Sequence, residues 1–207
     1  MKKIILTVAA VFVLGFANAQ DKKESKGFGF SKGDVYVEGN INMDSKNDKD
    51  ANTKTSSMNF SPSVGYFLSD NFAVGLNLDV TSAKTTVSGT DTAKNNGFGV
   101  GAYGRYYFLE VGQRFKTYTQ FGFNVGSSKD AISTYKTNTF DLGAGLGMNY
   151  FVTPKVAISF GLGNVISYGN TKMNMPGMDQ GSSEMKVNLN VFNNFFNTPT
   201  FGALYKF

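Results

Sequence analysis

The amino-acid sequence predicts an all-β protein, an eight-stranded antiparallel up-and-down transmembrane β-barrel. Three observations lead to this fold class. From residue 35 onward, apolar side chains recur at every second position in segments of roughly ten residues, the length that a tilted strand needs to cross a bilayer. Short turns alternate with long polar connections between these segments. The chain ends on a further alternating segment, "TFGALYKF", whose last residue is aromatic.

The first 33 residues precede the expected barrel. Residues 1–19 have the parts of a secretory signal peptide: two lysines, a short apolar run and an Ala-Asn-Ala cleavage site. Cleavage is expected between Ala19 and Gln20, and the alternative is a retained membrane anchor. Residues 20–33 are polar and charged and are predicted to form a flexible lead. The barrel domain is therefore expected to occupy residues 34–207.

The alternating segments are expected to be the strands of the barrel. They cover residues 35–43, 58–68, 72–80, 98–108, 115–125, 140–150, 156–162 and 201–207. Pro62 lies inside the second segment and predicts a bulge or a break in the strand pairing, because proline has no amide to donate. Residues 185–200 have two interpretations. They either join the last segment in one long strand, or form a short strand that ends at a kink in "FNNFFNTP".

The connections are expected to alternate in length, as in outer-membrane barrels. The short connections are residues 69–71, 109–114 and 152–155, and the long polar loops are residues 45–57, 81–96, 127–138 and 167–184. The long loops mix lysine with aspartate and would form the surface that faces the outside. Any recognition of a partner outside the cell is therefore expected to use them.

The face opposite the apolar one is rich in glycine and poor in charge. A solvated surface would carry more lysine and glutamate, whereas small residues suit the interior of a narrow barrel. We therefore expect the apolar face to contact lipid, with an aromatic girdle near the short-turn end. The girdle residues are Tyr66, Phe72, Tyr106, Phe108, Phe115, Tyr150, Tyr205 and Phe207.

Charged residues of both signs are expected inside the barrel, as a paired network. They are Glu38, Asp79, Arg105, Lys116, Asp141 and Lys206. Unpaired buried charges are costly, which favours pairing. The network is interpreted either as a structural plug or as the gate of a narrow ion path. Inward tyrosines favour the plug because eight strands leave little more than side-chain room, whereas the inward glycines leave space. These tyrosines are Tyr36, Tyr103, Tyr107 and Tyr118.

Composition limits the chemistry. The chain has no cysteine and therefore no disulfide. It has no histidine, which excludes Ser-His hydrolytic machinery and histidine-based zinc sites. The formal net charge is +5, or +3 without Lys2 and Lys3 of the expected signal peptide, and this balance does not suggest nucleic-acid binding. We expect no enzyme activity and no cofactor.

Two motifs are candidate sites. Residues 99–104 match G-x-G-x-x-G, but they lie in a strand-like alternation with no helix after them, so a structural role is favoured over a dinucleotide site. Met173, Met175 and Met178 have a spacing that could suit Cu(I), although methionine spacing alone is a weak signal. The alternative for these methionines is a loop that touches lipid headgroups or a partner.

The last strand resembles the terminal assembly signal of outer-membrane barrels, with Phe201, Tyr205 and Phe207 at its aromatic positions. Over residues 35–207 the chain resembles the small eight-stranded outer-membrane families of the OmpA-barrel and OmpX type. The resemblance implies a Gram-negative outer membrane after signal-peptide cleavage. It also implies contact with lipid and lipopolysaccharide, recognition by the barrel assembly machinery, and a monomer. The barrel enzymes of such membranes rely on a histidine that this chain lacks.

Three functions remain open at this point. The first is a non-enzymatic barrel with a structural or surface-interaction role through its extracellular loops. The second is a small pore or transporter for ions or small solutes. The third, less favoured, is a soluble periplasmic lipocalin-like binder.

Overall fold

The structure of the protein is a computed structural model that describes residues 27–133, 135–175, 178–190 and 200–207. The expected signal peptide, with the cleavage site between Ala19 and Gln20, lies outside the described residues. Among the described residues there is no helix long and apolar enough to span a membrane.

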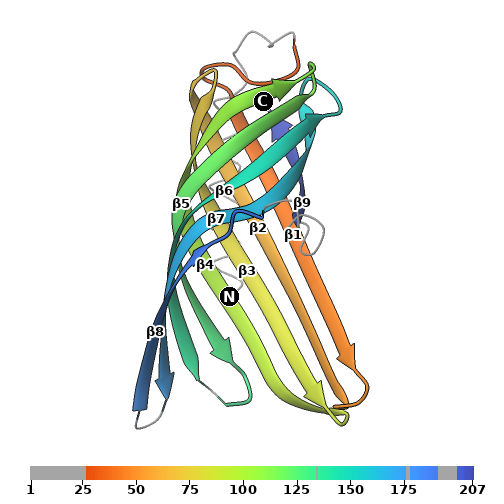
Figure 1. Ribbon diagram of the computed structural model, residues 1–207, viewed down its shortest axis with the longest axis vertical. Helices are drawn as coiled ribbons and strands as arrows, with labels where there is room; N and C mark the ends of the chain where they lie inside the picture. Colours follow the sequence, from red (N-terminus) through yellow and green to blue (C-terminus); the bar gives the residue numbers. More distant parts are fainter. Residues whose placement is uncertain (1–26, 134, 176–177, 191–199) are drawn as a thin grey trace.

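Nine antiparallel strands make up the described part of the chain. They are β1 (Val35–Asp48), β2 (Thr53–Ser69), β3 (Phe72–Val87), β4 (Thr90–Val111), β5 (Phe115–Asp130), β6 (Lys136–Phe151), β7 (Val156–Met175), β8 (Met178–Val187) and β9 (Thr200–Lys206). Each of β1 to β7 pairs with the next strand, and β9 pairs with both β7 and β1. The seven strands β1 to β7 and the strand β9 close a ring of eight, which confirms the predicted fold class (Figure 1).

The strands are tilted in the ring, as closure of a sheet requires. Following the register partners of Val37 through β2 to β6 leads to Tyr168 on β7. Following them the other way, through β9, leads to Val156 on the same strand. A row of paired residues therefore climbs along the barrel axis as it circles the wall.

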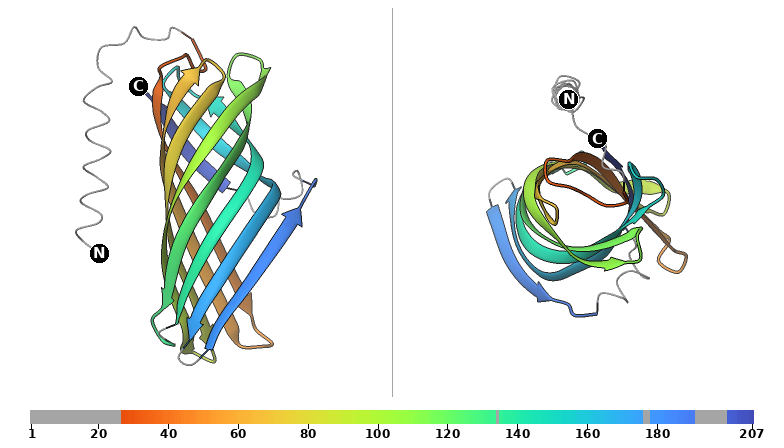
Figure 2. Two further views of the ribbon diagram at one scale, coloured as in Figure 1. Left: turned by 90° about the vertical axis from the view of Figure 1, so that its left-hand side faces the viewer. Right: turned by 90° about the horizontal axis from the view of Figure 1, so that it is seen from above.

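The eighth position of the ring is divided between two strands. β9 covers residues 156–161 of β7, and β8 covers residues 166–175 of the same edge (Figure 2). β8 ends at Val187, residues 188–190 belong to no strand, and β9 begins at Thr200. Residues 185–200 thus do not form one long strand with the last segment. The proposed kink at residues 191–198 lies outside the described residues.

Pro62 interrupts one of the two pairings of its strand. Its partner in β1 is Gly39, but the pairing of β2 with β3 skips from Phe60 to Ser63 without a change of register. The missing amide of proline explains why the break lies on one side. The predicted break in the pairing is confirmed.

The long polar loops were predicted wrongly, because most of their residues are in strands that extend the barrel wall. Residues 81–96, for example, form a hairpin between β3 and β4 around Ser88 and Gly89. Both residues have positive φ, 48° and 82°, as a tight two-residue hairpin turn requires. Beyond the apolar band both faces of these strands are polar, so the hydrophobic alternation that marks a strand in sequence is absent there.

The facing of the side chains follows the prediction. Outward apolar side chains such as Leu76, Phe123 and Leu142 are 62%, 49% and 51% exposed, whereas the inward Tyr36 is fully buried. The hydrophobic core is therefore inside the ring, in the half nearest the short turns. Its buried members are Tyr36, Phe67, Ala73, Tyr103, Tyr107, Tyr118, Phe151, Ala157 and Leu204.

The lead that was expected to be flexible packs against this core from Phe28 onward. Phe28 and Phe30 pack against the buried cluster. The ring of Phe30 stacks on Phe67 with a centroid distance of 4.2 Å. The sequence of the lead is mostly polar, and its two phenylalanines, each beside a glycine, have no alternating neighbours that would predict such packing.

Candidate functional site

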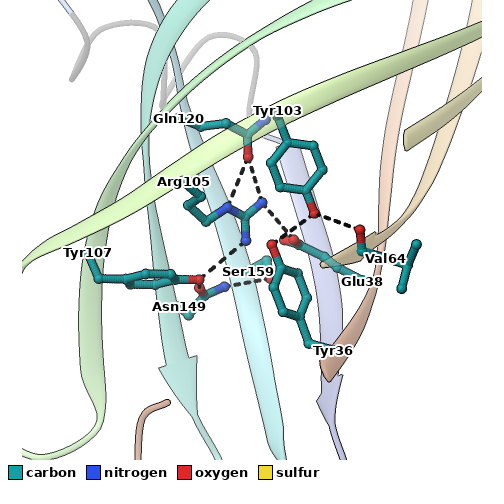
Figure 3. Close-up of polar contacts among 9 residues, drawn as sticks. All are labelled: Tyr36, Glu38, Val64, Tyr103, Arg105, Tyr107, Gln120, Asn149 and Ser159. Atoms are coloured by element: carbon teal, nitrogen blue, oxygen red, sulfur yellow. Dashed lines mark hydrogen bonds and ion pairs between the residues drawn. The ribbon is translucent and has the colours of Figure 1, made fainter. Parts of the chain in front are cut away.

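Four tyrosines fill the lumen in the short-turn half of the barrel. Tyr36, Tyr103, Tyr107 and Tyr118 are each less than 8% exposed. Tyr36 and Tyr103 come from β1 and β4 and share a hydrogen bond of 2.8 Å between their hydroxyls (Figure 3). Side chains from opposite parts of the ring therefore meet across the lumen.

Inward glycines accommodate these rings. A Cβ atom on Gly65 would overlap the ring of Tyr36. A Cβ atom on Gly75 would likewise overlap the ring of Tyr103, and one on Gly147 would overlap the ring of Tyr118. The space that the missing side chains leave is thus occupied by tyrosine. In this part of the lumen the glycines are no sign of an open channel.

Arg105 and Glu38 lie among these four tyrosines, and we call the six residues together the plug. Their side chains are 4% and 0% exposed, and Arg105 Nη2 is 2.8 Å from Glu38 Oε2. Neither carboxylate oxygen has an aligned hydrogen-bond donor among the described residues, so the contact is an ion pair without good hydrogen-bond geometry. Arg105 is therefore the one described group that neutralises the buried Glu38 carboxylate.

Further contacts fix the guanidinium in place. Its Nε and Nη2 atoms donate to Gln120 Oε1 at 2.9 and 2.8 Å. Its Cζ lies 4.1 Å from the ring centroid of Tyr118, which is within the range of a cation–π contact. Nη1 also donates to the hydroxyl of Tyr107 at 3.4 Å. The guanidinium is thus held by an ion pair, hydrogen bonds and an aromatic face.

A chain of hydrogen bonds continues from Tyr107 to the far wall (Figure 3). The hydroxyl of Tyr107 donates to Asn149 Oδ1 at 2.8 Å, and Asn149 Nδ2 donates to Ser159 Oγ at 2.8 Å. Asn149 and Ser159 are 0% and 1% exposed. Together with Arg105 and Glu38, these residues connect β1, β4, β6 and β7 across the lumen.

The six predicted lumen charges do not form one network. Among them only Glu38 and Arg105 pair with each other. Lys116 pairs with Glu110, at 2.7 Å, and Lys206 lies 3.6 Å from Asp34, both at the short-turn end. Tertiary register, which the sequence does not reveal, decides these partners.

The two remaining charges, Asp79 and Asp141, line a polar cavity of about 600 Å³ on the long-hairpin side of the plug. Asp79 accepts hydrogen bonds from Ser61, Asn77 and Asn124. Arg105, Gln120 and Tyr118 also border the cavity. The lumen therefore has a polar cup in one half and a plug in the other.

Sequence reasoning identified the plug's tyrosines and its central charges but not its supporting residues. Gln120, Asn149 and Ser159 were inward positions with no distinguishing feature. Phe30 was missed because it lies in the lead. The alternation that placed Tyr118 inside also placed Gln120 inside, because residues two apart in a strand face the same side. This alternation was the one signal in the sequence that could have pointed to Gln120.

Carboxylates also organise the long-hairpin end. The amides of Ile132 and Lys94 and the hydroxyl of Ser133 donate to Asp130, and these bonds hold the pKa of Asp130 below its usual range. Lys84, 2.9 Å from Asp91, lowers the pKa of that carboxyl. The hairpin tips are thus fixed by local polar contacts.

The other predicted motifs lie in strands. Residues 99–104 are in the middle of β4, and no described helix follows them, as expected for a structural role. Met173 and Met175 lie on β7, and Met175 pairs with Met178 at the start of β8. The side chains of Met175 and Met178 lie outside the described ones, so copper binding stays a prediction. The described residues hold no cluster of three or more His, Cys, Asp or Glu suited to a metal ion.

The aromatic positions of the last strand face outward. Phe201 and Tyr205 are 45% and 40% exposed, and the ring of Phe207 packs edge-on against Tyr205 at 4.8 Å. The amide of Phe207 donates to Val35 O at 2.9 Å, so the end of the chain is joined to the start of β1. Recognition of these residues by the assembly machinery stays a prediction.

One solved structure and one family model agree with this architecture. No curated protein matches the chain by sequence. OprG of Pseudomonas aeruginosa, a solved outer-membrane protein, is 16% identical with a TM-score of 0.52, over 86% of this chain and 98% of OprG. The outer membrane protein W of E. coli is 13% identical with a TM-score of 0.48, over 86% of this chain and 99% of that protein. The model of the outer membrane protein beta-barrel domain matches residues 7–206, and the chain therefore belongs to that family of outer-membrane barrels.

Proposed function

We propose that this outer-membrane protein is a non-conducting, non-enzymatic barrel that acts as a structural element and through its outward-facing hairpins. In barrels of this kind the short turns face the periplasm and the long connections face outside. The plug would then close the periplasmic half, and the polar cup would open toward the exterior. The observation that carries the proposal is the Arg105–Glu38 pair, buried among four tyrosines.

The physical reason is the diameter of the ring. Eight strands enclose a space that side chains can fill. Here the rings of Tyr36, Tyr103 and Tyr118 occupy the volume above inward glycines, and the side chains of the ion pair are almost fully buried. A hydrated ion would have to displace a ring or separate the buried pair, and removing one partner from such a pair costs about 3–5 kcal/mol.

Length supports a role for the hairpins. β4 has 22 residues and β7 has 20, whereas roughly 9–11 are enough to cross a bilayer. The surplus would project from the membrane as paired β-structure. The proposed partners are accordingly lipid and lipopolysaccharide around the wall and a surface ligand at the hairpin tips. The assembly machinery would act during biogenesis, and the mature protein would be a monomer after removal of residues 1–19.

A small pore is the second candidate, and the polar cup favours it. The cup has a volume of about 600 Å³ and is lined by both carboxylates and amides, so it could receive a cation or a small polar solute. Passage would still require the plug to open.

Purified protein in planar bilayers separates the two functions. The closed barrel should show no steady conductance at moderate voltage, and at most rare small openings. Stable channels in the unmodified protein would overturn the proposal and favour the pore. A single-channel record of Arg105→Ala serves as the positive comparison, because loss of the guanidinium should make openings more frequent.

A further inference from the structure

The residues just before β1 form a distinct contact with the short-turn end of the barrel. We call residues 28–34 the N-terminal latch. Phe30 is the side chain that enters the barrel. Its ring centroid lies 4.2 Å from that of Phe67 on β2, 4.8 Å from Tyr107 on β4 and 5.1 Å from Phe151 on β6. This surface is made by alternate strands of the ring, so it is complete only when the barrel is closed.

Polar contacts anchor the latch on both sides of β1. On one side Lys206 of β9 donates from Nζ to Gly29 O at 2.6 Å. On the other side Gly33 N donates to Phe67 O at 2.8 Å, and Phe67 N donates to Asp34 O at 2.9 Å. The latch therefore connects β9, at the end of the chain, to β2.

The latch crosses the junction between β1 and β9, which is the shorter of the two strand pairings of β1. β2 pairs with β1 over residues 35–48, whereas β9 pairs with it only over residues 36–41. The pairing between β8 and the described residues is confined to β7, so β8 does not extend this junction. Fewer backbone hydrogen bonds hold β1 to β9 than to β2, and added contacts matter most there.

Gly29 is required for the latch to fit. Its φ is +115°, a conformation that residues with a side chain rarely adopt, so a substitution there strains the backbone; a Cβ would also touch the flexible end of the Lys116 side chain. Gly27, two residues earlier, has no atom within 4 Å of such a Cβ. The chain thus offers a matched pair of glycines, one inside the contact and one beside it.

We propose that the N-terminal latch locks the β1–β9 junction and so stabilises the closed barrel, independently of whether the lumen conducts. Docking of Phe30 and the Lys206 contact with Gly29 would be lost when β9 separates from β1. The latch is therefore an intramolecular closing device supplied by the segment that precedes the first strand.

The first test measures the temperature at which the compact folded band disappears on a gel. Gly29→Val and Phe30→Ala should each lower this midpoint by several degrees and by at most about 20 °C, the upper limit for losing a fully buried phenylalanine, because Phe30 is partly buried. Gly27→Val should leave the midpoint unchanged. Equal midpoints for wild type, Gly29→Val and Phe30→Ala would overturn the proposal.

The second test asks whether the latch acts on the junction. The chain has no cysteine, and Ile41 and Phe201 are register partners across β1 and β9. A disulfide between Ile41→Cys and Phe201→Cys would hold the two strands together covalently. In the oxidised background Gly29→Val should no longer lower the midpoint, whereas after reduction its effect should return. An unchanged effect in the oxidised protein would mean that the latch contributes only local packing, and would overturn the role at the junction.

Discussion

Replacing Arg105 with methionine should destabilise the folded barrel by about 3–5 kcal/mol, the cost of leaving one charge of a buried pair without its partner. The structure explains why the cost should be high. The Glu38 side chain is 0% exposed, its carboxylate has no aligned hydrogen-bond donor among the described residues, and Arg105 is its ion-pair partner. The methionine stem can still fill the space between the rings, so the loss is mainly electrostatic.

A double-mutant cycle isolates the ion pair from the packing. Glu38→Leu together with Arg105→Met removes both charges, and a buried pair replaced by apolar groups of similar volume is often neutral or stabilising. We expect the double variant to lie within about 2 kcal/mol of the wild type, because Gln120 loses its donor but borders the polar cup and can be hydrated. Arg105→Lys should fall between these variants, since lysine keeps the charge but loses the planar fork.

The assay is denaturant unfolding of protein folded into lipid vesicles. The chain has no tryptophan, so the folded fraction is followed by gel mobility and circular dichroism. A cost below about 1 kcal/mol for Arg105→Met, or a double variant as unstable as the single one, would refute the reasoning that the pair is buried and mutually required.

Three further predictions test the wall, the chain end and the hairpin tips. Leu76→Arg should cost about 2–4 kcal/mol of folding free energy and Asn77→Arg clearly less, because the first faces lipid and the second borders the cup; equal costs would contradict the facing. Deleting Phe207 should reduce the amount of protein in the outer membrane, measured by fractionation, and normal levels would count against its role in assembly. NMR titration of Asp130 should give a midpoint below about 3.9, the usual aspartate value, and Ser133→Ala should raise it. Because this pKa is lowered by folding, the stabilisation is present above the usual aspartate pKa and lost as pH falls through the lower one.

The sequence determined the facing of the wall and the class of the fold. Alternation with a period of two fixes which residues share a side, and glycine with few charges on one side identifies the interior. This was enough to place Tyr36, Tyr103 and Arg105 inside the barrel. It also predicted that Pro62 would interrupt a pairing, because that effect depends on the residue alone.

The tertiary structure decided which inward residues meet. Partners across a lumen depend on shear and on the register of every strand between them, and a local pattern carries neither quantity. Glu38 therefore pairs with Arg105, while Lys206 turns to Gly29 and Asp34. The role of Phe30 is likewise invisible in the sequence, since a phenylalanine in a polar lead becomes a core residue only when the closed ring presents Phe67, Tyr107 and Phe151 together.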